Sequence, residues 1–315
     1  MIDLSEIYRV TRSFCYTCVY KGVDAINRVL HIRFPLHDVA RLKVLESEFA
    51  ASKWGHAWRG QVGCIDGVHF SMRSPGKAVP NPTRYFVARK DHFCILCIAI
   101  CDAQRRFLFY DMSKTATTHD SLAWTATPLG KAVMEGELPH PFFINGDAAF
   151  SRSDSMVVPS GAAQHDSYDY VQSSARMPIE CAFGMLVRRW GLLWRPLEIR
   201  FDRRSAVIGA CMRLHNFCID HRILDQTVIC RGLGETQPGR WELSPRFDEH
   251  GRPVEYLDTT RQCAEDQRSE RAVRTHLHLG GAPMSTLSRL VGSVQAAGLL
   301  RPALAPGLHK KRKRK

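Results

Sequence analysis

Three acidic residues occur beside apolar runs, where carboxylates are unusual. Asp66 directly follows the apolar residues 62–65, and Asp147 comes shortly after another apolar run at 142–144. Glu180 lies one position from the apolar stripe of an expected helix. An ionised carboxylate in such surroundings costs free energy unless another group compensates its charge. A divalent cation compensates it well, so the pattern indicates a metal site of Asp66, Asp147 and Glu180.

A site of this composition is suited to phosphodiester chemistry. Two strand carboxylates and one helix carboxylate can hold two Mg²⁺ or Mn²⁺ ions about 4 Å apart. Mg²⁺ prefers oxygen ligands and retains water, which leaves room for a phosphate group. One ion then activates the attacking water or hydroxyl, and the other stabilises the leaving 3′ oxygen during in-line displacement.

Each acid taken alone has an ordinary explanation. An Asp-Gly pair at a strand end often makes a turn, and a single helical Glu is usually solvated. Arg176 lies four residues before Glu180, on the same side of the expected helix, and can steer its carboxylate. The prediction therefore requires all three acids to come together in the folded chain.

The surrounding patterns predict the elements that would position these acids. Residues 93–101 are an unbroken apolar run, typical of a strand buried on both faces, and residues 106–110 complete a hairpin with it. A further strand is predicted over 141–144. Helices are predicted over 122–135, from Ser173 or Ser174 to about Trp190 with Pro178 in the first turn, and over 203–219.

The same reading divides the chain into three parts. Residues 1–58 are predicted to be helical, as a partial DNA-binding element or as a support packed on the next domain. Residues 59–222 hold all the motifs and are expected to form the catalytic domain. In residues 223–315 periodicity fades, so we expect a mostly irregular, poorly ordered extension with a basic tail at 310–315.

The charge balance favours a polyanionic partner. The chain has 44 Lys and Arg against 31 Asp and Glu, a net charge of +13. A basic surface binds nucleic acid because neutralised phosphates release condensed counterions. The basic tail at 310–315 resembles a nuclear-import signal, and the alternative is a merely solvated tail. We therefore expect a nuclear protein that binds DNA.

Membrane and zinc-binding classes are disfavoured. The longest apolar run, Phe93 to Cys101, is far shorter than the roughly 20 residues of a membrane helix. The first residues lack the basic and apolar regions of a secretory signal. The cysteines are scattered, several of them inside apolar stretches, as expected for buried, reduced thiols.

Several segments together form a recognisable pattern. They are GCIDGVHFSMRSP at 63–75, YFVARKDHFCILCIAICDAQRRF at 85–107, THDS at 118–121, FINGDAAF at 143–150, SSARMPIECAFGMLVRRWGLL at 173–193 and RLHNFCID at 213–220. In this order they resemble one protein family, the PIF/Harbinger transposase-derived nucleases of the DDE superfamily. The resemblance implies an α/β fold of the ribonuclease H-like type, with a mixed central sheet flanked by helices. It also implies that Asp66, Asp147 and Glu180 are the catalytic acids of a metal-dependent endonuclease.

The resemblance adds further candidates around the acids. Asp120 matches a His-Asp-Ser motif and could lie near the metal ions, whereas its alternative role is to cap a helix. Three basic pairs, Arg89-Lys90, Arg188-Arg189 and Arg203-Arg204, could contact backbone phosphates, although such pairs more often form a solvated face. Family members are thought to act with a separate Myb-like DNA-binding partner, which is therefore an expected partner here.

A non-enzymatic reading stays open beside the nuclease. The N-terminal region is short for this family, and the C-terminal extension has no clear family counterpart. These departures favour a domesticated nuclear DNA-binding or scaffold protein that keeps the fold without cutting, or a decayed transposon copy. The intact set of Asp66, Asp147 and Glu180 favours the nuclease.

Overall fold

The chain divides into two compact units. A computed structural model describes residues 2–52, 55, 57–162, 165–221, 246–247, 253–254 and 285–299. One unit comprises Met1–Ile223 with Pro283–Lys315, and the other comprises Leu224–Ala282. Within the second unit, the described residues form a short antiparallel pair of β7 (Arg246–Phe247) and β8 (Pro253–Val254). Everything below concerns the first unit.

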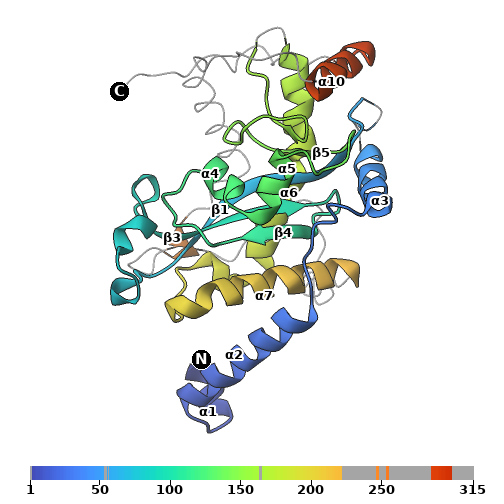
Figure 1. The fold of residues 1–315 in the computed structure, drawn as a ribbon. Coiled ribbons are helices and arrows are strands. Elements are labelled where there is room, and N and C mark those ends of the chain that lie inside the picture. Colours follow the sequence, from blue (N-terminus) through green and yellow to red (C-terminus); the bar gives the residue numbers. More distant parts are fainter. Residues whose placement is uncertain are drawn as a thin grey trace. The chain divides into compact units, whose positions relative to one another are not determined.

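A mixed sheet forms the centre of the first unit (Figure 1). Its strands are β1 (Gln61–Ser71), β2 (Phe86–Val87), β3 (His92–Cys101), β4 (Phe107–Asp111), β5 (Phe143–Asn145) and β6 (Met156–Val157). They follow the order β2-β3-β1-β5-β6, and β4 also pairs with β3. β1 runs antiparallel to β3, and β3 runs antiparallel to β4, whereas β5 lies parallel to both β1 and β6.

Helices cover both faces of this sheet because β3 is apolar on both. Leu96, Ile98 and Ile100 alternate with Ile95, Cys97, Ala99 and Cys101 along the strand. The first set packs with α3 (Val39–Ala50), α4 (Asp120–Thr125) and α5 (Pro128–Met134). The second set packs with α6 (Asp166–Arg189) and α7 (Phe201–Asp220). The predicted α/β class with a mixed sheet between helices is confirmed.

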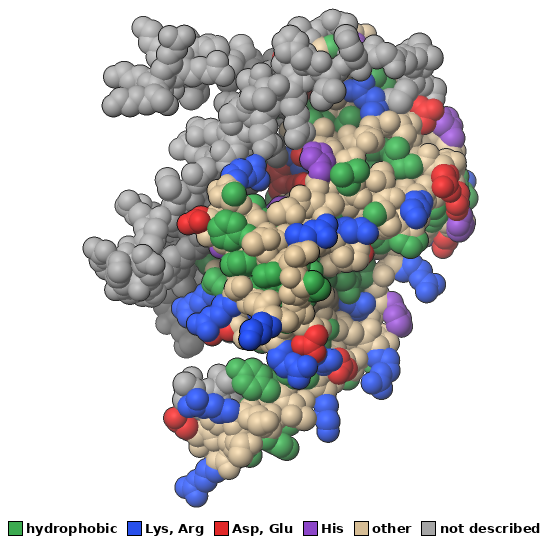
Figure 2. All heavy atoms as spheres, turned by 60° about the vertical axis from the view of Figure 1, so that its left-hand side comes forward, with side chains coloured by type: hydrophobic (Ala, Val, Ile, Leu, Met, Phe, Trp, Pro, Cys, Tyr) green, Lys and Arg blue, Asp and Glu red, His purple; other side chains and the backbone are tan. Residues whose placement is uncertain are grey.

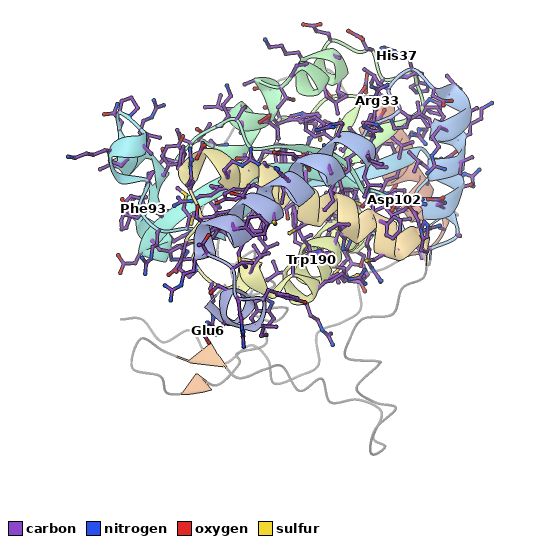
Figure 3. All side chains as sticks on the ribbon, turned by 90° about the horizontal axis from the view of Figure 1, so that it is seen from below. Glu6, Arg33, His37, Phe93, Asp102 and Trp190 are labelled. Carbon is purple, nitrogen blue, oxygen red and sulfur yellow. The ribbon has the colours of Figure 1, made fainter. Side chains whose placement is uncertain are left out.

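The N-terminal segment is attached to the rest of the first unit through α2, which packs on α7 (Figures 1 and 3). This segment forms the helices α1 (Ile2–Ile7) and α2 (Arg12–Val29). Val23 of α2 packs against Val207 and Ala210 of α7, and Asn27 donates a 2.9 Å hydrogen bond to the Ala206 carbonyl. This contact attaches α2 to the rest of the first unit, and the roles predicted for residues 1–58, a partial DNA-binding element or a support, both stay predictions. Figure 3 also labels Phe93, near the start of β3, and Asp102, which directly follows the end of β3.

Short 3-10 turns connect the principal elements. They are η1 (Gly76–Ala78), η2 (Pro82–Tyr85), η3 (Ala88–Lys90) and η5 (Gly191–Trp194). The helix predicted over 122–135 is in fact two helices, α4 and α5. Thr127 separates them by capping α5: its hydroxyl accepts from the Gly130 amide at 2.9 Å, and Pro128 occupies the first helical position.

Two expectations about helix α6 and strand β1 were wrong. α6 begins at Asp166 rather than near Ser173, so Pro178 lies inside the helix and not in its first turn. β1 continues to Ser71, so Asp66 lies in the middle of the strand and not at its end. Both errors arise because polar residues extend these elements beyond their apolar parts.

The C-terminal extension departs from expectation at residues 285–299. Ser285–Ala296 forms helix α10, and Leu290 and Val294 are buried in a cluster with Trp58, Phe143 and Tyr168. α10 is therefore part of the first unit and packs beside α6. The basic tail at 310–315 and most of the remaining extension lie outside the described residues.

The packing of α10 predicts a stability effect. Leu290→Ala should lower the free energy of unfolding by about 3 kcal/mol, because a fully buried leucine leaves a cavity. Chemical denaturation followed by tryptophan fluorescence measures this change, with Ser288→Ala on the exposed side of α10 as the control. An unchanged denaturation midpoint for Leu290→Ala would show that α10 does not contribute to the fold.

Candidate active site

Strand alternation in β1 places Asp66 on the face that α6 covers. Cys64 and Val68, two positions away on either side, pack in the cluster formed with α6 and α7. Asp66 therefore faces α6, where Glu180 is located. Gly67 and His69 face the opposite side, toward α4. The His69 ring forms a 3.0 Å hydrogen bond with the Ala116 carbonyl, which is an ordinary structural role for a half-buried histidine.

Arg176 joins Asp66 and Glu180. Its Nη1 atom donates to Asp66 Oδ2 at 3.1 Å, and its Nη2 atom donates to Glu180 Oε1 at 2.6 Å. The Arg176 side chain is 3% exposed, against 20% for Asp66 and 28% for Glu180. The predicted steering of Glu180 by Arg176 is thus present, and the same guanidinium also holds Asp66. One buried cation orients two acids from separate elements.

The Asp66 carboxyl group is poorly suited to carrying a charge on its own. Burial raises the pKa of Asp66 from 3.8 to about 7. The positive charge of Arg176 lowers this pKa, as does the Gly67 amide, which donates to Asp66 Oδ1 at 2.8 Å. The nearby negative charges of Asp147 and Glu180 raise it. Arg176 thus offsets only part of the cost of burying this charge, and Asp147 and Glu180 add to that cost.

Asp147 lies just beyond the end of β5 and interacts with acids on both faces of β1. Its Oδ1 atom accepts a 2.9 Å hydrogen bond from the Ala149 amide, which fixes the carboxylate in a tight turn. Its charge raises the pKa of Asp66 and also that of Asp120. The structure therefore brings Asp66, Asp147 and Glu180 into one electrostatic group, with Asp120 coupled to it through Asp147.

Asp120 reaches this group because residue 67 is a glycine. A Cβ atom at Gly67 would lie 2.7–2.9 Å from the carboxyl atoms of Asp120, closer than real contacts allow. The alternative role of Asp120 as a helix cap was wrong. His119 caps α4, since its Nδ1 atom accepts from the Ser121 amide at 3.3 Å. Burial, followed by the charge of Asp147, raises the pKa of Asp120. The sequence offered no role for Gly67 beyond a turn, so this close approach was not predicted.

The donor chemistry of the site fits a hard divalent cation. Asp66, Asp120, Asp147 and Glu180 offer carboxylate oxygens, the ligands preferred by Mg²⁺. Burial and the repulsion between these acids raise the pKa values of Asp66 and Asp120. A cation additional to Arg176 would therefore stabilise their ionised forms. Among the residues that the structure describes, no group of three or more His, Cys, Asp or Glu side chains is already arranged to hold a metal ion. In this arrangement Arg176 is the cation that Asp66 and Glu180 share.

The three predicted basic pairs differ in their surroundings. Arg203 is paired with Asp24 and Arg204 is buried, so this pair does not form a free basic surface. Arg89 and Lys90 are exposed on η3, and their charges lower the pKa values of His69 and Asp120, so they border the acidic group. Arg188 and Arg189 are half-buried in the last turn of α6. Figure 2 shows Lys and Arg side chains distributed over the displayed face. The position of Arg89 and Lys90 suits contact with a polyanion at the site better than that of Arg188 and Arg189.

A group of buried amides behind the acids was not foreseen from the sequence. Gln61, Asn145 and Gln172 have no exposed surface, and hydrogen bonds connect them to one another. Each occurs close in sequence to a predicted acid or its arginine. The available signal was a polar residue at the edge of an apolar run, but nothing in the sequence showed that the three would meet.

Comparison with known proteins finds one family that part of the chain resembles. A family model described as DDE superfamily endonuclease matches residues 65–216, just under half of the chain. The matched segment contains Asp66, Asp120, Asp147 and Glu180. This part of the chain is therefore similar to DDE superfamily endonucleases, as the predicted resemblance to that superfamily required. No curated protein and no solved structure matches the chain.

The raised pKa of Asp66 predicts a pH-dependent stability in metal-free buffer. Between pH 4 and pH 7 the folded protein retains a proton that the unfolded chain has lost. The free energy of unfolding should therefore fall as pH rises through this range. Asp66→Asn removes this loss and should stabilise the protein at pH 8 by on the order of 3 kcal/mol, with little effect at pH 4.

Thermal or chemical unfolding in the presence of a chelator measures this difference. Asp202→Asn, which removes an exposed acid on α7, is the control and should change stability little at either pH. If Asp66→Asn changed stability equally at pH 4 and pH 8, the buried acid would not have the environment described above.

Proposed function

We propose that this protein is a transposase-derived, metal-dependent DNA endonuclease. The observation that carries the proposal is the electrostatic coupling of Asp66 to both Asp147 and Glu180 within the segment that matches the endonuclease family. The three acids come from a strand centre, a strand end and a helix, and all three interact with the buried Arg176, an arrangement that is enriched at functional sites. The net charge of +13 and the exposed Arg89-Lys90 pair support DNA as the substrate.

The proposed roles follow from the positions of the side chains. Asp66, Asp147 and Glu180 would hold a divalent cation, Mg²⁺ or Mn²⁺, with Asp120 as a further ligand beside Asp147. The bound cation would supply Lewis acidity for attack of water on phosphorus and for departure of the 3′ oxygen. Arg176 keeps the carboxylates of Asp66 and Glu180 oriented. Arg89 and Lys90 would bind the DNA backbone next to the acids.

The finer assignments are part of the same proposal. The order β4-β3-β1-β5-β6, antiparallel over the first three strands and parallel over the last two, supports a ribonuclease H-like topology. The matching segments support a PIF/Harbinger origin, and with it action beside a Myb-like DNA-binding partner. The basic residues at 310–315 support a nuclear location. No helix in the described parts of the chain is long and apolar enough to span a membrane.

Nicking of supercoiled plasmid DNA tests the proposal. The purified protein should nick the plasmid with Mn²⁺ or Mg²⁺ and should be inactive with a chelator. Asp147→Asn should lower the nicking rate by about 100-fold or more, because loss of a direct ligand should exceed the effect of losing a supporting residue. Asp202→Asn, which also removes one acidic charge, should nick at the wild-type rate.

Two other outcomes would contradict the proposal in different ways. Equal nicking by wild type and Asp147→Asn would show a contaminating nuclease or a wrong assignment of the acids. Absence of nicking, together with no thermal stabilisation by Mn²⁺, would favour the non-catalytic DNA-binding or scaffold protein instead.

A further inference from the structure

The buried amides Gln61, Asn145 and Gln172 connect α6 to the two strands that carry the aspartates. Gln61 begins β1, five residues before Asp66, and Asn145 ends β5, two residues before Asp147. Gln172 lies on α6, eight residues before Glu180, which corresponds to about 12 Å along a helix. The amide network therefore contacts all three elements of the site without including a catalytic acid.

Gln172 and Asn145 bind α6 to β5. Gln172 Nε2 donates to Asn145 Oδ1 at 2.7 Å and to the Gly146 carbonyl at 2.6 Å. In return, Asn145 Nδ2 donates to the Gln172 carbonyl at 3.1 Å. Gly146 immediately precedes Asp147, so the bond to its carbonyl fixes the backbone from which Asp147 projects.

Gln61 binds α6 to β1. Its Nε2 atom donates to the Ala175 carbonyl at 3.0 Å, and the Cys64 thiol donates to the same carbonyl at 3.3 Å. Trp58 Nε1 in turn donates to Gln61 Oε1 at 2.6 Å, which orients the amide. Ala175 immediately precedes Arg176, so this contact fixes the position of Arg176 along β1, opposite Asp66.

Pro178 makes this side-chain bonding important for the helix. A proline inside a helix has no N–H group for the carbonyl four residues earlier, here that of Ser174, and its ring crowds that carbonyl. α6 thus lacks the helical hydrogen bond between Ser174 and Pro178. The bonds from Gln61, Cys64 and Asn145 hold the segment just before this point against the sheet.

The energetics favour a positioning role over a purely stabilising one. Three buried amides lose their hydration, and Gln172 Oε1 has no hydrogen-bond partner among the described residues. Apolar side chains of similar size would fill this space without that cost. Directional bonds, in contrast, allow only one register of α6 along β1 and β5.

We propose that Gln172, Asn145 and Gln61 are positioning residues that fix the register of α6 along β1 and β5. This register places Glu180 and Arg176 of α6 against Asp66 and Asp147. This inference rests on the proposed metal-dependent function. Supporting residues behind metal ligands commonly change metal affinity by about 10- to 100-fold. Mg²⁺ requires near-ideal octahedral geometry, whereas Ca²⁺ accepts irregular arrangements of oxygen ligands. Displaced acids should therefore lose Mg²⁺ more than Ca²⁺.

Metal binding by Gln172→Met tests the inference, with thermal shifts titrated against Mg²⁺ and Ca²⁺ separately. Methionine is close to glutamine in size and removes both donated bonds. The concentration of Mg²⁺ that gives half of the thermal shift should rise about 10-fold or more, and that of Ca²⁺ by less than about threefold. Gln172→Asn, which keeps an amide on a shorter side chain, serves as a second variant if Gln172→Met does not fold.

Asn216→Leu is the matched control. Asn216 ties α7 to β4 through two 2.8 Å bonds with the Phe107 backbone, away from the acids. The Asn216→Leu variant should have a lower melting temperature than wild type, with unchanged Mg²⁺ and Ca²⁺ titrations. If Gln172→Met behaved like Asn216→Leu, the amides would only stabilise the fold and the positioning role would be refuted. If wild type responded to neither metal, the metal-dependent function itself would fail, and the positioning role with it.

Discussion

Burial of the Asp66 carboxylate in the middle of β1 is the constraint on which the site depends. A charge at the centre of a sheet requires a nearby cation, and Arg176 supplies one from α6. Because Arg176 also binds Glu180, a strand and a helix distant in sequence share one counter-charge. The negative charge that remains, mainly from Asp147, gives the site its capacity for an additional cation. The ionised form of Asp66, which would bind the metal ion, therefore lowers the stability of the fold when no metal is bound.

The position of α6 brings the other groups of the site next to Asp66. Its middle carries Arg176 and Glu180 across β1, while its first half packs beside α10 and contacts the ends of β1 and β5 through buried amides. The other face of the sheet contributes Asp120, admitted by the missing side chain of Gly67. Alternation along β1 thus divides the acids between the two faces, and Asp147 at the end of β5 links them electrostatically.

The sequence predicts much of the framework and the identity of the acids. The unbroken apolar run of β3, its hairpin with β4 and the helix α7 were predicted because they are strongly apolar or periodic. The full extent of β1 and α6 was not, because Val68–Ser71 and Asp166–Gln172 contain polar residues whose partners lie far away in sequence. The same reason hid the close approach of Asp120 to Gly67 and the meeting of the three amides. Such contacts depend on register, which single-sequence patterns do not encode.

Crystals soaked in Mn²⁺, with diffraction data collected at the manganese absorption edge, would show whether these carboxylates bind a metal ion. We expect an anomalous peak among the carboxylates, with oxygen atoms of Asp66 and Asp147 in the first coordination sphere and Glu180 adjacent. Crystals of Asp66→Asn should lack the peak under the same conditions. Strong Mn²⁺ binding elsewhere, with Asp66 still paired only to Arg176, would contradict the assignment of these acids as the metal site.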